Sequence, residues 1–299
     1  MRVLSFVLAT LISVMALGVK AAEIEHAMGK TTVPDVPQRV VVLTNEGTEA
    51  LLSLGLKPVG AANSWTGDPW YPHIAAQMDG VEPVGKESAV NLELIAALQP
   101  DLILGTKLRH EAIYEQLSAI APTVISERLR GDWRENFKLW AKAVNREEDG
   151  RKVLADFDAH AAKLADALGE AKKEKVSIIR FMPGHIRIYQ KDSFSGFIFD
   201  KIGFARPANQ DVDDFVLKVG KESIPDMDGD RLFYFTYEPG DGEATKLAEE
   251  VLGDPLWATL GAMKAGKVHA VDDTIWNTAG GVLAANLMLD DIARIYGVE

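Results

Sequence analysis

The segment NREEDGRKVLADFDAHAAKLADALGEAKKEK, residues 145–175, lies near the middle of the chain and contains no proline. Its apolar residues recur every three or four positions, which places them on one face of a helix. They are Val153, Phe157, Ala161, Leu164 and Leu168. A helix from Asp149 to Glu174 would be about 39 Å long at 1.5 Å per residue. This length suits either a rigid helix that joins two lobes or a long helix within one large domain.

Strand and helix patterns alternate on both sides of this segment. Compact apolar runs predict strands at residues 39–43, 58–61, 81–85, 101–105, 122–126, 175–181, 186–189, 231–237 and 267–271. Amphipathic runs predict helices at residues 45–54, 91–99, 109–120, 132–144, 194–202, 244–252 and 281–296. Such alternation is typical of α/β lobes with mainly parallel sheets. We therefore expect an α/β fold with two Rossmann-like lobes, a single long linking helix and a ligand cleft between the lobes.

The chain divides into four predicted parts: a signal peptide at 1–21, an N-terminal lobe at 22–147, the linking helix at 148–174 and a C-terminal lobe at 175–299. Arg2 precedes an apolar run that ends in small residues, which is typical of a secretory signal peptide cleaved after Ala21. An uncleaved membrane anchor is the alternative. Because the sequence has no cysteine for lipid attachment, we expect a soluble periplasmic protein.

Composition and motifs exclude several classes of function. A net charge of −12 argues against nonspecific binding of nucleic acid or anionic lipid, and the lack of cysteine excludes disulfides and thiolate sites. No Gly-x-Ser-x-Gly motif is present, and the P-loop spacing at 261–267 has Val268 where a Ser or Thr belongs. No two histidines stand four residues apart, although distant ones could converge. We therefore predict no enzyme, no catalytic residue and no metal ligand.

Basic and aromatic residues recur at the ends of the predicted strands. The candidate ligand-binding residues are Lys86, Lys107, Arg109, Arg180, Arg187, Tyr237, Trp276 and Asn277, together with the loop residue Trp65. Any one of these charges alone is typical of an ordinary surface. Their recurrence at one end of several strands, in an acidic protein, indicates a cleft that holds an anion.

Six longer motifs are distributed along the chain between residues 37 and 292. They are PQRVVVL (37–43), NLELIAALQPDLILG (91–105), IYEQLSAIAPTV (113–124), GKESIPDMDGDRLF (220–233), DPLWATL (254–260) and VDDTIWNTAGGVLAANLMLDDI (271–292). In these motifs the chain resembles the periplasmic iron–siderophore substrate-binding proteins of ABC importers. Residues 178–207 resemble members that bind ferric hydroxamate or citrate-type siderophores.

The resemblance implies capture of a ferric siderophore and its delivery to an ABC-transporter permease for iron uptake. Glu93 and Glu222 match carboxylates that dock onto the permease, and the basic and aromatic residues above match the ligand cleft. Lys86 departs from the pattern, because the family's cleft cation often sits one residue later, where this chain has Glu87. The siderophore itself would hold the iron, so the resemblance implies no cofactor and no metal ligand, in a monomer.

Three alternatives remain open from the sequence. The same architecture could bind haem, vitamin B12 or another metal chelate, with Tyr237 as a candidate axial ligand for haem. An α/β enzyme would need a nucleophile, cofactor loop or metal cluster, none of which the motifs supply. An exported scaffold that binds only protein would leave the basic and aromatic strand ends unexplained.

Overall fold

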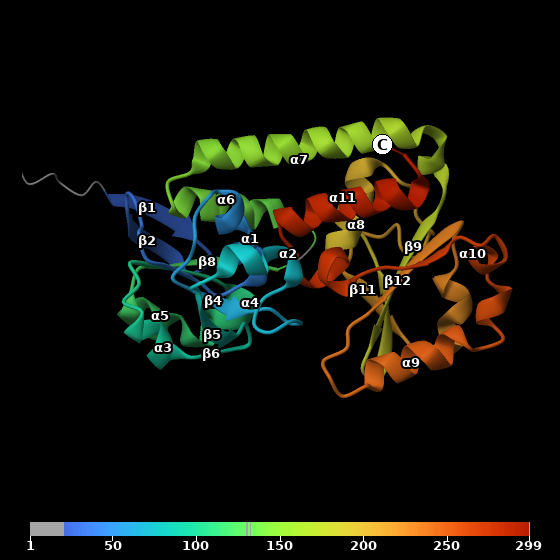
Figure 1. The fold of residues 1–299 in the computed structure, drawn as a ribbon, viewed down its shortest axis with the longest axis horizontal. Helices are drawn as coiled ribbons and strands as arrows, with labels where there is room; N and C mark the ends of the chain where they lie inside the picture. The colour runs from blue at the N-terminus through green and yellow to red at the C-terminus, as the bar shows by residue number, and fades with distance from the viewer. Residues whose placement is uncertain (1–20, 130, 132, 299) are drawn as a thin grey trace, which may run out of the picture.

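Two separate sheets form the framework of the protein (Figure 1). The computed structural model describes residues 21–129, 131 and 133–298. The first half of the chain builds a six-stranded sheet in the order β6-β5-β4-β3-β7-β8, and the second half builds a five-stranded sheet in the order β11-β10-β9-β12-β13. The expected signal peptide lies outside the described residues except for Ala21, which begins a strand. No helix among the described residues combines the length and apolar character needed to span a bilayer.

The N-terminal sheet is parallel except at its edge. Its strands are β3 Val40–Val42, β4 Gly60–Asn63, β5 Glu82–Lys86, β6 Ala89–Val90, β7 Leu102–Thr106 and β8 Thr123–Ser126. Its helices are α1 Asn45–Ser53, α2 Pro72–Ala75, α3 Leu92–Ala97, α4 Lys107–His110, α5 Tyr114–Ile120 and α6 Trp133–Ala143. Only the β5–β6 pair is antiparallel. The central strand β3 is buried at every residue, as its continuous valine run predicts.

The C-terminal sheet is mixed. Its strands are β9 Val176–Met182, β10 His185–Tyr189, β11 Val216–Val219, β12 Arg231–Thr236 and β13 Val268–Ala270. Its helices are α8 Phe194–Ile202, α9 Glu243–Leu252, α10 Gly261–Lys264 and α11 Val282–Tyr296. Strand β9 pairs in parallel with β12 but antiparallel with β10, because the turn at Pro183 and Gly184 folds the chain directly back.

Helix α7, Glu147–Leu168, is the long helix that the opening segment predicts. It lies along the top of the molecule in Figure 1 and passes over both sheets. Its buried stripe runs from Gly150 through Leu154 and Phe157 to Leu168. The helix ends before the expected Glu174, because Gly169 has a positive φ of 49° and begins the 3-10 helix η3, Gly169–Lys173.

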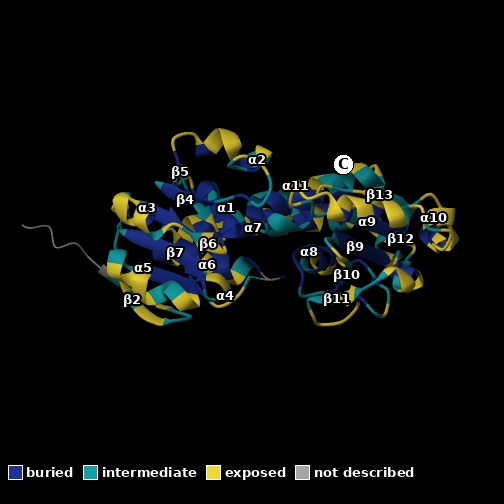
Figure 2. Cartoon of the chain, turned by 90° about the horizontal axis from the view of Figure 1, so that it is seen from below, coloured by how far each residue is buried: buried dark blue, intermediate teal, exposed yellow. Residues whose placement is uncertain are grey.

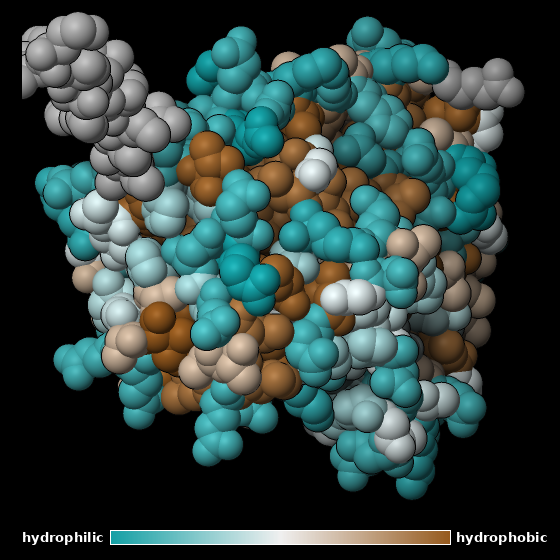
Figure 3. All heavy atoms as spheres, turned by 60° about the vertical axis from the view of Figure 1, so that its left-hand side comes forward, coloured by the Kyte–Doolittle hydropathy of each residue, from teal (hydrophilic) through white to brown (hydrophobic). Residues whose placement is uncertain are grey.

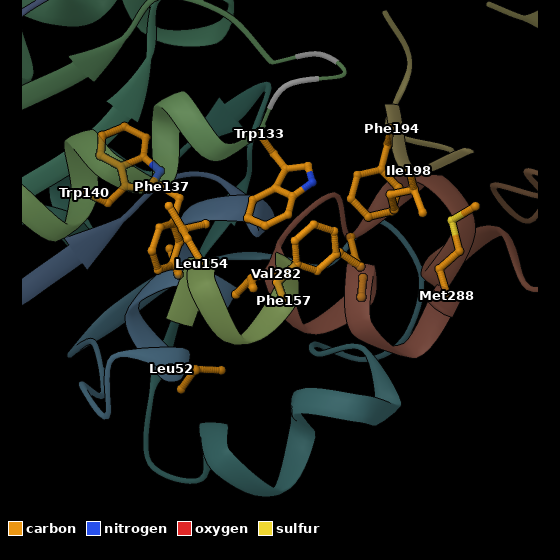
Figure 4. Close-up of a cluster of buried hydrophobic side chains, with 14 of the residues drawn as sticks. Leu52, Trp133, Phe137, Trp140, Leu154, Phe157, Phe194, Ile198, Val282 and Met288 are labelled. Atoms are coloured by element: carbon orange, nitrogen blue, oxygen red, sulfur yellow. The ribbon is translucent and has the colours of Figure 1, made fainter. Parts of the chain in front are cut away.

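One hydrophobic core runs through both halves of the chain. Trp133 of α6 meets the ring of Phe157 in α7 edge-on at 5.3 Å between ring centroids (Figure 4). It also meets the ring of Phe197 in α8 at 6.4 Å. Figure 2 shows the buried residues concentrated in the two sheets and in the helices between them. On the face shown in Figure 3, hydrophilic and hydrophobic residues are interspersed.

A buried carboxylate links the two halves directly. Glu49 of α1 has a fully buried side chain, and its Oε2 atom accepts hydrogen bonds from the backbone N–H groups of Leu283 and Ala284, each at 2.9 Å. These amides belong to the first turn of α11, where a helix has unpaired donors. His73 Nε2 lies 2.6 Å from Glu49 Oε1. Gly281 permits this close approach, since a Cβ atom there would lie 2.6 Å from Glu49 Oε2.

Several elements differ from the expectation. The hairpin β1 Ala21–His26 with β2 Gly29–Pro34 and the edge strand β11 lie where no strand was predicted. The helix expected at 109–120 is divided into α4, the 3-10 helix η2 Glu111–Ile113, and α5. The division occurs at His110, whose buried ring is held by hydrogen bonds to the Thr106 backbone N–H at 3.0 Å and the Glu87 carbonyl at 3.1 Å.

Replacement of Glu49 by Ala should destabilise the whole protein. It removes a buried charged acceptor and leaves two helix N–H groups without partners, which costs about 2–4 kcal/mol of the free energy of unfolding. Urea unfolding followed by circular dichroism measures this loss. The exposed Glu148→Ala variant, in the first turn of α7, is the matched control and should match the wild type. A Glu49→Ala variant as stable as that control would contradict the linking role.

Candidate functional site

A cavity of about 310 Å³ lies between the two sheets. Six predicted ligand residues line it, namely Trp65, Arg109, Arg180, Arg187, Tyr237 and Asn277. The remaining lining residues are Glu46, Glu87, Leu129, Met182, Phe194, Phe215, Thr278, Ala279 and Gly280. Both halves of the chain contribute, as expected for a cleft beyond the strand ends of two facing α/β lobes.

Arg180 is the most firmly held cation of the cleft. It is buried in β9, and its guanidinium forms a two-point ion pair with Asp273, at 2.5 Å from Nε to Oδ1 and 2.9 Å from Nη2 to Oδ2. Its Nη1 atom also donates to the Tyr189 hydroxyl at 3.2 Å, and the guanidinium lies 4.8 Å from the ring centre of Tyr237. Because Asp273 balances its charge, Arg180 contributes a polar surface of fixed geometry to the cleft and little net positive charge.

Arg187 lies opposite Arg180 on the neighbouring strand β10. Its Nε atom lies 3.3 Å from His185 Nε2. No carboxylate among the described residues forms an ion pair with it, in contrast to Arg109 and Arg180. Among the described arginines that line the cavity, Arg187 is therefore the one whose charge no carboxylate balances.

The N-terminal wall combines a cation, an aromatic ring and a buried acid. The Arg109 guanidinium lies 5.5 Å from the Trp65 ring centre, and its Nε atom is 3.9 Å from Glu87 Oε2. Glu87 accepts hydrogen bonds from the backbone N–H of Asn45 at 2.6 Å and from its side chain at 2.8 Å. Burial is the main cause that raises the pKa of Glu87 above its usual value, against the lowering effect of these hydrogen bonds and of Arg109.

Glu46 is a second buried acid of the cleft. Its Oε1 atom accepts a hydrogen bond from Asn136 Nδ2 at 2.6 Å. Burial raises its pKa well above the usual value, and the nearby carboxylates of Glu87 and Glu49 raise it further. Glu46 was not predicted as a site residue, because an acid in the first turn of a helix is an ordinary capping feature. Its position just after the central strand β3 was the available signal.

Three predicted ligand residues do not line the cavity. Lys86 is exposed at the end of β5, and Lys107 pairs with Glu127 at 3.3 Å outside the cleft. Trp276 is fully buried: its indole N–H donates to Asp291 at 3.1 Å. The π-helical turn η6, Thr274–Thr278, directs this indole into the core while Asn277 lines the cavity.

Two polar contacts join the lobes beside cavity-lining residues. Thr66 Oγ1 lies 3.1 Å from Thr274 Oγ1, and Arg128 Nη1 lies 3.4 Å from Asp192 Oδ2. Thr66 follows the lining residue Trp65, and Arg128 precedes the lining residue Leu129. The loops that carry them thus bring the two lobes into contact beside the cleft.

The predicted docking residues are exposed and lie on different lobes. Glu93 stands in the first turn of α3, and Glu222 stands in the 3-10 helix η4, Lys221–Met227. Glu222 Oε1 accepts a hydrogen bond from the Gly220 backbone N–H at 3.2 Å. Within the described part of the chain, no group of three or more histidine, aspartate or glutamate side chains is arranged to hold a metal ion.

Comparisons with known proteins agree on one family. The family model described as periplasmic binding protein matches residues 40–274. The probable siderophore-binding lipoprotein YfiY of Bacillus subtilis is 51% identical, over 93% of this chain and 88% of its own length. The achromobactin-binding periplasmic protein of Dickeya dadantii is 32% identical, over 88% of each chain. The crystal structure of Staphylococcus aureus SirA complexed with staphyloferrin B is 33% identical and covers 93% of this chain and 99% of its own, with a TM-score of 0.87.

The Bacillus subtilis relative corrects the predicted location. The sequence predicts a soluble periplasmic protein without a lipid anchor, whereas a relative that is 51% identical is named a lipoprotein. The lack of cysteine in the sequence supported the prediction, but it does not outweigh a relative of this similarity. The predicted location is therefore wrong by this comparison.

The Glu46→Gln variant should be as stable as the wild type at acid pH and more stable than the wild type at higher pH. Because the pKa of Glu46 is raised in the folded state, the folded protein binds its proton more tightly than the unfolded chain does. Stability that is fully present below the unfolded pKa of about 4.3 is then lost as pH rises toward the folded pKa. Gln keeps the acceptor for Asn136 and has no proton to lose. Unfolding by urea at pH 4 to 8 should show equal stabilities at the acid end and an advantage for Glu46→Gln above it. A constant difference across this range would contradict the prediction, and Glu148→Gln serves as the exposed control.

Proposed function

The chain belongs to the periplasmic binding protein family, and from this premise we propose that it captures a ferric siderophore of hydroxamate or citrate type and delivers it to an ABC-transporter permease. The observation that carries this proposal is the cavity between the lobes, with Arg109, Arg180 and Arg187 in its walls beside Trp65 and Tyr237. The relatives named for siderophore, achromobactin and staphyloferrin B binding support the substrate class.

The chemistry of the cargo explains the composition of this cleft. A siderophore saturates its iron with its own oxygen atoms, so the protein has to recognise the surface of a metal complex and supplies no ligand to the metal. Guanidinium groups bind the outward oxygen atoms, and aromatic rings pack on the organic shell. Arg109 offers both modes at once, because its guanidinium lies over the Trp65 ring. No resident cofactor enters this proposal.

The buried acids add selectivity. Glu87 is fixed by Asn45, and Glu46 is fixed by Asn136, so each presents its remaining acceptor capacity in a set direction. A ligand group that can both donate and accept a hydrogen bond, such as a hydroxyl, suits this side of the cleft. An apolar group would leave part of the hydrogen-bonding capacity of these buried acids unused, which costs affinity. The N-terminal wall therefore selects the polarity of the ligand as well as its charge.

The haem alternative gains no support from Tyr237. Burial raises the pKa of its hydroxyl, with only partial opposition from the charge of Arg180. We also propose that the chain catalyses no reaction, consistent with the binding-protein family to which it belongs. The cleft residues then serve recognition only.

Titration of tryptophan fluorescence with ferric complexes tests the binding function. Trp65 lines the cavity, so a bound iron complex should quench the emission with a dissociation constant in the micromolar range or below. The panel contains ferric hydroxamate, citrate-type and catecholate complexes, with haem, vitamin B12 and the iron-free ligands as controls. Arg109→Gln should weaken binding about tenfold by loss of a charge-assisted contact. The exposed Arg151→Gln on α7 is the matched control. Failure of every ferric complex to quench the folded protein would refute the function.

The two docking residues make a separate prediction. The double variant Glu93→Ala and Glu222→Ala should keep its affinity for the ferric complex, because neither residue lines the cavity. It should lower siderophore-dependent iron uptake in cells that carry the matching permease, because the carboxylates that meet permease arginines are gone. Glu148→Ala is the control for loss of an exposed glutamate. Undiminished uptake by the double variant would count against docking through these residues.

A further inference from the structure

Three cations stand in a row across the C-terminal sheet. Arg180 on β9 pairs directly with Arg187 on β10, and Arg187 pairs directly with Lys218 on β11. Residues directly opposite each other in antiparallel strands point to the same face, with Cβ atoms about 4.5–5.5 Å apart. Arg180 and Arg187 line the cavity, so Lys218 extends the same row outward from it. We call these three residues the cationic row.

In the described part of the chain, the positive charges of the cationic row are balanced by carboxylates at its inner end and not at its outer end. Arg180 has the two-point ion pair with Asp273, whereas Arg187 and Lys218 form no ion pair with any described carboxylate. Like charges opposite each other in a sheet repel, so this arrangement opposes folding unless an anion joins it. Lys218 is exposed on β11, which is the edge strand of its sheet.

The electric field of the row reaches a neighbouring side chain. Burial is the main cause that lowers the pKa of His185, and the charges of Arg187, Lys218 and Arg180 lower it further. The three cations therefore act on one point together. A concentration of positive charge at the mouth of a cleft, on a protein of net charge −12, is suited to attract an anionic ligand and orient its entry.

We propose that Arg187 and Lys218 form an outer subsite for a carboxylate that is not bound to iron, so that the protein prefers carboxylate-bearing anionic ferric complexes over uncharged ones. This inference rests on the proposed function and narrows its substrate class. The inner part of the cleft holds the iron-bearing core of the complex, while Arg187 and Lys218 receive a free carboxylate that projects toward β11. Arg187 contributes mainly affinity, because it lines the cavity. Lys218 contributes mainly the rate of association, because it is exposed at the rim.

Stopped-flow fluorescence with two probes tests the subsite. Ferric dicitrate carries free carboxylates and a net negative charge, and an uncharged ferric trihydroxamate does not. Lys218→Gln should slow association of ferric dicitrate about threefold at low salt and leave its dissociation rate unchanged. Arg187→Gln should weaken its affinity about tenfold or more. Neither Lys218→Gln nor the matched control Lys264→Gln, an exposed lysine on α10, should alter the trihydroxamate kinetics.

Salt and a conservative variant separate this role from a structural one. At about 0.5 M salt the effect of Lys218→Gln should disappear, because screening is then effective within a few ångströms. Lys218→Arg should restore the wild-type association rate. A lysine on an edge strand can also serve only to prevent pairing between sheets, and its loss would then promote association of the protein with itself without changing ligand kinetics.

The outcomes separate the two levels of the proposal. Binding of ferric dicitrate with the predicted salt-dependent effect of Lys218→Gln supports the outer subsite. Equal effects of Lys218→Gln and Lys264→Gln, or binding of the uncharged trihydroxamate alone, overturn the subsite and leave siderophore binding standing. If the folded wild-type protein binds neither probe and no other ferric complex, the outer subsite and siderophore binding are both overturned.

Discussion

The bond between the Glu49 carboxylate and the first turn of α11 is the constraint that sets the geometry of the cleft. It joins α1, which follows the central strand of one sheet, to the helix that ends the C-terminal lobe. A buried charge is tolerated there because helix N–H groups and His73 surround it. Glu46 lies one helical turn before Glu49, and Gly280 and Gly281 lead into α11. The same bond that fixes the lobes therefore also places Glu46 and Gly280 at the cavity.

The cleft is not simply a basic pocket in an acidic protein. Asp273 balances Arg180, Glu87 lies beside Arg109, and only Arg187 among the lining arginines lacks a carboxylate partner within the described residues. The ion pair with Asp273 limits the cost of burying Arg180, whereas Arg109 and Arg187 stay partly exposed to water. This arrangement also concentrates the uncompensated charge on one side. Within the described residues, the cleft therefore presents its uncompensated positive charge from the side of Arg187.

The sequence predicts most of the fold but only part of the site. The valine run of β3 and the apolar stripe of α7 can be recognised in the sequence, because each pattern depends only on which residues of that one element are buried. The sequence does not show that Trp276 points into the core, because adjacency to a strand end does not reveal the direction of a π-helical turn. Lys218, which we propose for the outer subsite, could not be found from the sequence, because its pairing with Arg187 depends on strand register and β11 has no clear pattern of its own. Local sequence patterns do not reveal side chains whose role depends on the pairing of strands that are distant in the sequence.

The continuous core limits how this architecture can be rearranged. Two sheets and a linking helix suggest two modules that could be exchanged between proteins or produced separately. Trp133 and Phe157 contradict this view, since they pack together between the sheets and Trp133 also meets Phe197 of the second half. A chain cut at α7 would expose these rings to water on both sides of the cut. New ligand preferences must therefore evolve by substitutions on the walls of the cleft, because the lobes cannot be recombined as independent parts.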